Sequence, residues 1–146
     1  MDLYQMLIQD HRAVDDLFEK IEKSGKNANR TRQQLFGKLR EELELHTRVE
    51  EQIVYPDFKK HERVKDFIGE ALEEHGEVKK MLQQLGRMEP GAAEWSAGIA
   101  DLKKAVQHHV REEEQRIFPA ARKEIDEDEA NDLARRVQAM KQKATA

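Results

Sequence analysis

The sequence predicts an all-α protein: an up-down antiparallel four-helix bundle made from a duplicated helical hairpin, with a short C-terminal helix. Glu, Lys, Arg, Leu, Ala and Gln dominate the 146 residues, and there are only three prolines. Apolar residues recur at the spacing of amphipathic helices in four long segments. The second half of the chain also repeats the pattern of the first. We therefore expect one domain over residues 1–146, with the bundle over about 2–124 and the tail helix over about 128–143.

The first two expected helices form one hairpin. The first starts after Asp2, a suitable N-cap, and stops at Ser24-Gly25. The second begins near Thr31, because Thr31 and Gln34 have the spacing of a capping box. The apolar stripes are Leu3, Leu7, Val14, Phe18 and Ile21 on the first helix, and Leu35, Leu39, Leu43 and Ile53 on the second.

The other two expected helices form a second hairpin. One covers about residues 64–85 and stops at Gly86, with Pro90-Gly91 beyond it. The other is marked by Trp95, Ile99, Leu102, Val106 and Ile117. A tail helix after Asp128 would bury Leu133 and Val137. Helices of ~20 residues are about 30 Å long, and the short connections favour antiparallel neighbours.

An internal repeat relates the two hairpins. Residues 46–56 align without gaps to residues 109–119, and six of these eleven positions are identical. The preceding helices also match, with Asp10-His11 opposite Glu74-His75. A duplicated hairpin explains the pattern and identifies what each half contributes.

Each half supplies one histidine from its first helix and a His-x-x-x-Glu from its second. The six residues are His11, His46 with Glu50, His75, and His109 with Glu113. Residues four apart lie one above the other on a helix face, and here that face is the apolar one. All six side chains should therefore point into the bundle at about the same depth.

Two carboxylates in such a place need compensation. An unpaired buried carboxylate costs several kcal/mol, in a domain whose total stability is ~5–15 kcal/mol. No Lys or Arg lies beside Glu50 or Glu113 on those stripes. A pair of metal ions would neutralise both charges and fill the histidine lone pairs. Imidazole and carboxylate without thiolate suit iron, with manganese or zinc as alternatives, and we expect the glutamates to bridge two such ions.

The remaining histidines do not follow the repeat. It places His108 opposite an apolar position, so we interpret His108 as a neighbour of the site. A rival assignment would use His108 with Glu112, or Glu114 in place of Glu113. His61 is interpreted as a surface or loop residue, with proton transfer or metal uptake as the alternative.

Three aromatic residues also lie near the pattern. Tyr55 and Phe118 precede the two matching prolines, and we interpret both as packing residues. Tyr4 stands seven residues before His11 on the same helix face. We expect it to pack in the core, with approach to the metals as the alternative.

Composition excludes several function classes. The chain has no cysteine, which removes disulfides, thiolate metal sites and thiol catalysis. Its net charge is −4, without the basic stripe typical of nucleic-acid binding. The absence of a signal segment and of any apolar run of ~20 residues predicts a cytoplasmic protein. Neither a phosphate-binding glycine loop nor a zincin motif is present.

The motif resembles that of the hemerythrin-like family, the proteins with an HHE cation-binding domain. The resemblance covers about residues 2–123 and includes the order, spacing and duplication of His11, His46 with Glu50, His75, and His109 with Glu113. It implies a non-haem di-iron centre with an oxo or hydroxo bridge. It also implies a small exogenous ligand, because the relatives include oxygen carriers, gas or iron sensors, iron–sulfur repair proteins and peroxide-consuming proteins.

The sequence departs from the oxygen carriers at one ligand. Those proteins have a fifth histidine four residues after the one that matches His75, and Lys79 stands there in this chain. Their last carboxylate has the spacing of Glu114, although the repeat favours Glu113. Six ligands leave more metal positions open, which argues against simple reversible oxygen carriage. Three functions stay open: a protein that binds O2 or NO, a catalase- or peroxidase-like enzyme, and an iron-handling protein whose metal is mainly structural. We expect a monomer or weak dimer.

Overall fold

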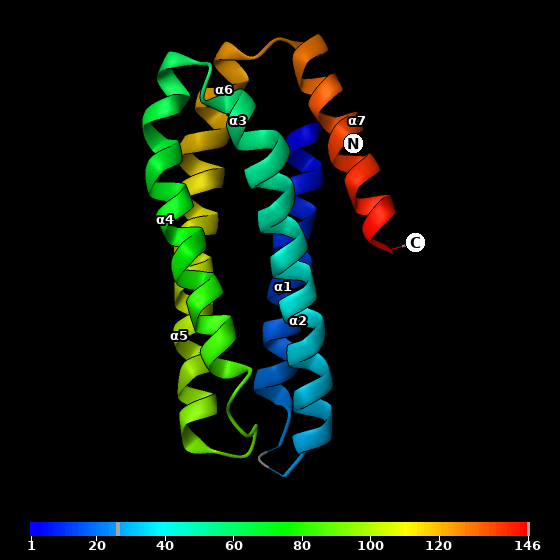
Figure 1. Cartoon of the computed structure of the whole chain (residues 1–146), viewed down its shortest axis with the longest axis vertical. Coiled ribbons are helices and arrows are strands. Elements are labelled where there is room, and N and C mark those ends of the chain that lie inside the picture. Colours follow the sequence, from blue (N-terminus) through cyan, green and yellow to red (C-terminus); the bar gives the residue numbers. More distant parts are fainter. Residues whose placement is uncertain (26, 146) are drawn as a thin grey trace.

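The structure, a computed structural model, describes residues 1–25 and 27–145. Four long helices run alternately up and down (Figure 1): α1 (Leu3–Lys23), α2 (Asn29–Val49), α4 (Glu62–Leu85) and α5 (Ala93–Glu112). One π-helical turn follows α2 (η1, Glu50–Val54) and another follows α5 (η2, Glu113–Ile117). The remaining helices are α3 (Tyr55–Phe58), α6 (Phe118–Glu124) and the C-terminal α7 (Glu127–Thr145). The expected all-α bundle is confirmed.

The helix starts agree with the sequence only in part. The carboxylate of Asp2 accepts a hydrogen bond from the backbone N–H of Gln5 at 2.8 Å, and the Gln5 side chain accepts one from the Asp2 N–H at 3.0 Å. This capping box confirms the expected N-cap of α1. The capping box expected at Thr31 is wrong, because the Ala28 carbonyl already accepts from Arg32 and Thr31 lies inside the helix.

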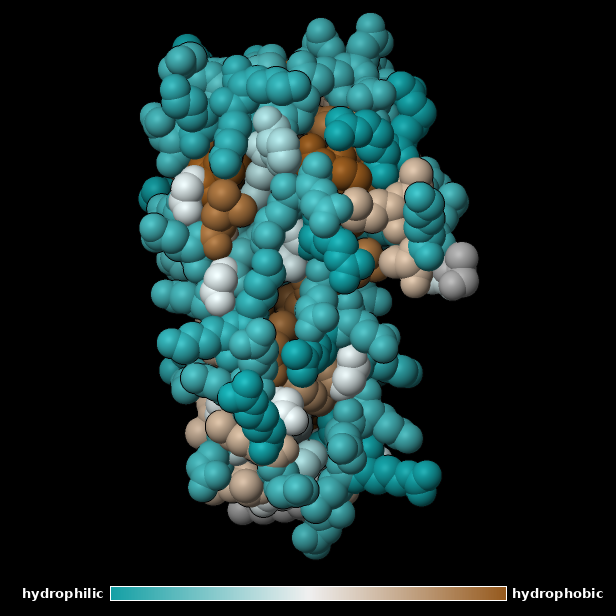
Figure 2. Space-filling view, in the orientation of Figure 1, coloured by the Kyte–Doolittle hydropathy of each residue, from teal (hydrophilic) through white to brown (hydrophobic). Residues whose placement is uncertain are grey.

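The apolar core is divided into two clusters along the bundle. One lies toward the end that carries α3 and α6 and includes Leu7, Ile68 and Phe118. The other lies toward the opposite end and includes Phe18 and Trp95. The predicted polar residues fall between the two clusters on every long helix. The outer face is largely hydrophilic, and apolar side chains show mainly in the seams between helices (Figure 2).

The tail helix α7 packs beside α1, α2 and the turn η1. Its buried contacts are Leu133 and Val137, as expected from the sequence, and its 19 residues agree with the expected span of about 128–143 to within two residues at each end. Across residues 1–25 and 27–145, no helix is long and apolar enough to span a bilayer.

Candidate metal centre

The two π-helical turns begin at the glutamates that the repeat singled out. The backbone N–H of Tyr55 bonds to the carbonyl of Glu50, five residues back, and Phe118 bonds in the same way to Glu113. A proline follows each of these aromatic residues and lacks the N–H that regular α-helical bonding would use. Single π turns of this kind are frequent at functional sites. The duplication therefore extends to the backbone of the site.

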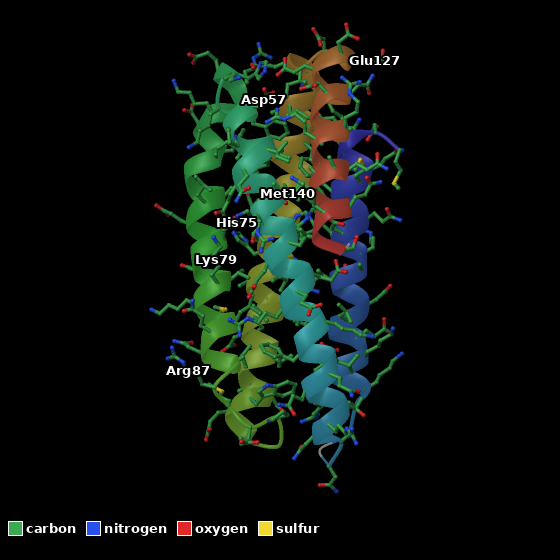
Figure 3. The ribbon with its side chains drawn as sticks, turned by 45° about the vertical axis from the view of Figure 1, so that its right-hand side comes forward. Asp57, His75, Lys79, Arg87, Glu127 and Met140 are labelled. Carbon is green, nitrogen blue, oxygen red and sulfur yellow. The ribbon has the colours of Figure 1, made fainter. Side chains whose placement is uncertain are left out.

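All six residues predicted to bind metal lie in one buried layer between the two apolar clusters. They are His11, His46, Glu50, His75, His109 and Glu113. The histidines come from four different long helices, and each points Nε2 toward a glutamate of the layer. His75, for example, lies midway along α4 (Figure 3).

The six residues form two groups of three. His11 and His46 lie with Glu113, whereas His75 and His109 lie with Glu50. Within each group, one ligand atom from each residue lies within 4.8 Å of the others. Each glutamate thus joins the two histidines of the other repeat.

Each glutamate also contacts a histidine of its own repeat. Oε1 of Glu50 lies 3.1 Å from Nε2 of His75 and 3.3 Å from Nε2 of His46. Oε1 of Glu113 lies 3.1 Å from Nε2 of His11 and 3.4 Å from Nε2 of His109. Each carboxylate faces both groups, which is the placement that a bridging ligand requires.

Two atoms of the layer have no hydrogen-bond partner in the described part of the chain. They are Nε2 of His46 and Oε2 of Glu50, and both are buried. Leaving such an atom unsatisfied costs roughly 1–3 kcal/mol. Imidazole nitrogen and carboxylate oxygen are both good ligands for iron, manganese and zinc. The donor set and its two orphaned atoms therefore fit a pair of metal ions.

The outward nitrogen of every histidine in the layer meets a carboxylate. The Nδ1–carboxylate pairs are His11–Glu114 at 2.7 Å, and His46–Asp10, His75–Glu51 and His109–Glu74, each at 2.8 Å. A carboxylate in this place fixes the tautomer and orientation of a ligating imidazole and raises its basicity. The four pairs hold Nε2 of each ring toward the centre.

A basic side chain lies beyond each of these carboxylates: an arginine, two lysines and a histidine. The four contacts are Arg12 with Glu114 at 3.2 Å, Lys79 with Glu51 and His108 with Glu74 at 3.0 Å each, and Lys141 with Asp10. Sequence reasoning missed the four supporting carboxylates, apart from weighing Glu114 as a ligand. The signal was present, because each acidic residue adjoins one of the six predicted ligands and recurs in the repeat.

Charge coupling within the layer is strong. Burial and the charge of Glu113 raise the pKa of Glu50, but the surrounding histidines outweigh them and hold it at about 2. Burial lowers the pKa of His109, but Glu113 outweighs it and raises the pKa to about 12. The pKa of His46 also lies well above its usual value, since Glu50 and Asp10 outweigh burial. Without metal, protonated histidines compensate the two carboxylates.

Tyr55 packs in the apolar core as expected, but its hydroxyl also reaches the polar layer, which the sequence did not indicate. Its hydroxyl donates to Oε2 of Glu113 at 2.7 Å and lies 3.2 Å from Oε1 of Glu50. Burial and the two glutamates raise the pKa of Tyr55 well above its usual value, so the phenol keeps its proton. The matching residue Phe118 has no hydroxyl and packs beside the rings of Tyr4 and His11. The two halves of the centre therefore differ.

The other sequence candidates lie outside the layer. His108 is 54% exposed and contacts Glu74, so it is a neighbour of the site as predicted. Glu114 supports His11 from the outside, and Glu112 is not among the grouped ligand atoms. His61 lies in the turn before α4, where it contacts Glu129. Tyr4 is buried against Phe118, as expected for a core residue.

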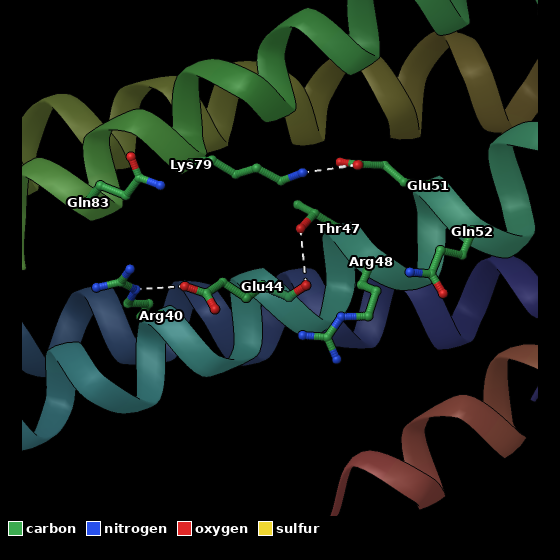
Figure 4. A pocket seen from close by; sticks show the side chains of 8 residues that line it. All are labelled: Arg40, Glu44, Thr47, Arg48, Glu51, Gln52, Lys79 and Gln83. Atoms are coloured by element: carbon green, nitrogen blue, oxygen red, sulfur yellow. Dashed lines mark hydrogen bonds and ion pairs between the residues drawn. The ribbon is translucent and has the colours of Figure 1, made fainter.

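A surface pocket of about 460 Å³ approaches the layer between α2 and α4 (Figure 4). Its wall includes Thr47 and the ion pair between Lys79 and Glu51. Since Glu51 bonds to Nδ1 of His75, this ion pair separates the pocket from one of the two ligand groups.

Comparisons with known proteins agree with this centre. A family model described as the hemerythrin HHE cation binding domain matches residues 2–121. A crystal structure of a hemerythrin HHE cation binding domain-containing protein from Mycobacterium kansasii is similar, with a TM-score of 0.86 and 26% identity. The match covers 99% of this chain and 88% of that one.

Two curated relatives are longer than this chain. A protein of Nostoc sp. named DNA nickase is 30% identical over 148 residues, which cover 98% of this chain and 40% of that protein. An uncharacterized hemerythrin-like protein of Schizosaccharomyces pombe is 29% identical over 130 residues, covering 88% and 63% respectively. This chain thus spans less than two thirds of either relative. The family match includes every residue of the buried His and Glu layer, and the chain belongs to the hemerythrin HHE cation-binding domain family.

Proposed function

We propose that the chain holds two iron ions, bound by His11, His46, Glu50, His75, His109 and Glu113, and reacts there with a small exogenous ligand. The observation that supports the proposal is the set of ligand atoms that face the inside of the layer. Four imidazole Nε2 atoms and two carboxylates converge there, and two of their atoms make no hydrogen bond to the described residues. Manganese or zinc would fit the same ligands, and iron is proposed because the chain belongs to the hemerythrin family.

The chain prepares this centre in two ways. The outer carboxylates hold every imidazole with Nε2 inward, so little reorganisation is needed when metal binds. The two glutamates face both ligand groups, so each would help to hold both ions. A di-iron pair can exchange two electrons with a bound oxidant.

The exogenous ligand must be small, because all six side chains of the layer are buried. Dioxygen, nitric oxide and hydrogen peroxide meet this condition. Lys79, at the position of the carriers' fifth histidine, is 48% exposed and pairs with Glu51 on the outside of the layer. The protein thus supplies six ligands, and coordination positions stay open to the exogenous molecule.

Tyr55 favours peroxide as the substrate. Its hydroxyl keeps a proton and lies within hydrogen-bond distance of both glutamates, in the middle of the ligand set. Reduction of peroxide to two water molecules consumes two protons. Because its raised pKa opposes transfer of the phenol proton, Tyr55 would act by donating a hydrogen bond that positions a peroxide molecule in the site. A catalase-like reaction, in which two peroxides give dioxygen and two water molecules, is the form of this function that needs no further reductant.

The proposal is tested with iron-loaded protein and the Tyr55→Phe variant. Phe118 shows that phenylalanine is accepted at the matching position, so the variant should remove the hydroxyl with little change in packing. We expect unchanged iron content and a loss of at least about 10-fold in oxygen release from peroxide. If wild type and variant release oxygen equally, Tyr55 has no role in the reaction. If neither releases oxygen, the peroxide function fails, and spectral titration with dioxygen and nitric oxide tests the binding functions.

Two other functions are less well supported. An iron-handling protein would have to release its metal readily. The carboxylates that hold the four imidazoles in place would slow such release. DNA nicking is named for the Nostoc relative, of which this chain covers 40%. We do not extend that activity to this chain, because a DNA backbone would not reach the buried ligands and the net charge is −4. Incubation of the iron-loaded protein with supercoiled plasmid should leave the plasmid closed.

A further inference from the structure

We infer that the chain carries a second site, for a single divalent ion, formed by Asp57, His61 and Glu129. The three residues come from different elements: α3, the turn before α4, and the first turn of α7. One ligand atom from each lies within 4.8 Å of the others. Asp57 follows Glu50 by seven residues, which places this site roughly 10 Å farther along the bundle. It lies at the end where α7 begins, near the labels of Asp57 and Glu127 in Figure 3.

The histidine and a carboxylate of this site already face each other. Nε2 of His61 lies 2.7 Å from Oε2 of Glu129, and the two side chains are only 20% and 31% exposed. Nδ1 of His61 points to the other side, where Oε2 of Glu124 lies 3.7 Å away. The imidazole thus has Nε2 toward the ligand atoms, as the four histidines of the main centre do, but the carboxylate beyond its Nδ1 is farther away than a hydrogen bond allows.

One oxygen of the site has no partner in the described part of the chain. Oδ2 of Asp57 is buried and makes no hydrogen bond, although the other oxygen lies 3.7 Å from Nζ of Lys60. Its carboxyl also lies beside that of Glu129, so like charges meet there. Burial and this neighbour raise the pKa of Asp57 to about 6. A divalent cation would satisfy the orphaned oxygen and remove the repulsion between the two carboxylates.

The only other His-containing group away from the centre, within residues 1–25 and 27–145, is weaker. Glu70, Glu74 and His108 come within the same distance of one another, but Glu70 and His108 are exposed. Glu74 is also engaged by Nδ1 of His109 and so supports the main centre. None of the three residues Asp57, His61 and Glu129 contacts a histidine of the main centre.

The ligand chemistry identifies the class of ion. One imidazole and two carboxylates without thiolate suit zinc or another divalent first-row ion, with water in the remaining position. Because Glu129 is in the first turn of α7, the bound ion would link the start of that helix to the corner between α3 and α4. The proposal is independent of the chemistry at the main centre.

The test uses full-length protein whose main centre is first loaded with iron. Zinc is then titrated under calorimetry, and both metals are counted by elemental analysis after gel filtration. We expect one zinc ion per chain in addition to the iron. The variants His61→Gln and Glu129→Gln should each weaken zinc binding at least about 10-fold while iron content stays unchanged. His108→Gln, in the competing group, is the matched control and should bind zinc as wild type does.

Each result decides the proposal. Iron-loaded wild type that binds no zinc up to millimolar concentration overturns it without reference to any variant. Loss of zinc in His108→Gln but not in His61→Gln overturns it in favour of the other group. Failure of iron to load would instead count against the main centre, so the two proposals fail separately.

Discussion

At the scale of single residues, the proposed di-iron centre would give the glutamates and the histidines of the layer different roles. Glu50 approaches histidines of both repeats, and Glu113 does the same. Each histidine, in contrast, has one inward nitrogen and can therefore bind only one metal ion. Removal of a glutamate should affect both metals, whereas removal of a histidine should affect one.

Replacement of a bridging glutamate should therefore remove most of the dinuclear centre. We expect Glu50→Ala or Glu113→Ala to lose most of the iron of the wild type. His11→Ala, His46→Ala, His75→Ala and His109→Ala should chiefly weaken one ion each. His61→Ala and His108→Ala are the controls and should keep their iron. Elemental analysis after iron loading is the measurement, and normal iron content in both glutamate variants would refute the bridging role.

Metal binding should release protons. The pKa of His109 is raised to about 12 and that of His46 lies well above its usual value, so both are protonated at neutral pH in the metal-free protein. Metal ligation needs neutral imidazole, whereas Glu50 and Glu113 are already ionised and contribute no proton. Loading with ferrous iron at pH 7 without oxygen should therefore release protons from these two histidines, and the affinity should fall as the pH is lowered. Calorimetry in buffers of different ionisation enthalpy measures the number of protons released, and a value of zero would contradict the charge state described here.

The sequence predicted which residues gather in the layer, but not how they are supported. The inward positions of the six residues were predicted from helical periodicity and from the repeat. Both can be read within a single helix. The contact of Asp10 with His46 crosses between α1 and α2, and only packing decides which imidazole the carboxylate meets. The hydroxyl contacts of Tyr55 were missed for a different reason. The π turn before it inserts a residue, which rotates the ring relative to regular helical spacing and carries the hydroxyl to the glutamates.

At the scale of elements, α7 packs on the bundle and also contacts a residue that supports the buried layer. It buries Leu133 and Val137 against the rest of the protein, and its Lys141 pairs with Asp10, which holds His46. The sequence predicted the two apolar contacts of this helix, and it predicted the span to within two residues at each end.

Truncation of the main apolar contact should loosen α7. Leu133 is 1% exposed, and Leu133→Ala should lower the free energy of unfolding by ~2–5 kcal/mol, as is usual for a buried leucine. The control is Arg135→Ala on the same helix, because the side chain of Arg135 is 72% exposed. This variant should change the free energy of unfolding little. Chemical denaturation of the iron-loaded proteins measures both values. Equal stability of the two variants would mean that α7 is not packed as described.

At the scale of the whole molecule, a charged layer divides the apolar core into two clusters. In the metal-free protein this layer depends on protonated histidines and leaves buried atoms unsatisfied. Bound metal would fill those positions and link four helices. Binding to the folded state alone also adds to its stability, by about 2.7 kcal/mol at a free metal concentration of 100 times Kd.

The metal-free protein should therefore unfold at a clearly lower temperature than the iron-loaded protein. Calorimetric scans before and after chelation, at equal protein concentration, give the comparison. A chelated Glu113→Ala sample is the control, because chelation should matter little once the centre has been lost. Equal melting temperatures for the two wild-type forms would favour a hydrogen-bonded His and Glu cluster without a structural need for metal.

The most direct measurement is an anomalous difference map, recorded at the iron edge from crystals of the iron-loaded protein. The account predicts two peaks per chain inside the buried layer. Each should lie at ~2.0–2.2 Å from two histidine Nε2 atoms and from oxygens of Glu50 and Glu113, the distances typical of such ligands. A single peak, or peaks that contact His108 or Glu114 in place of the six named residues, would contradict a dinuclear centre of four histidines and two bridging glutamates.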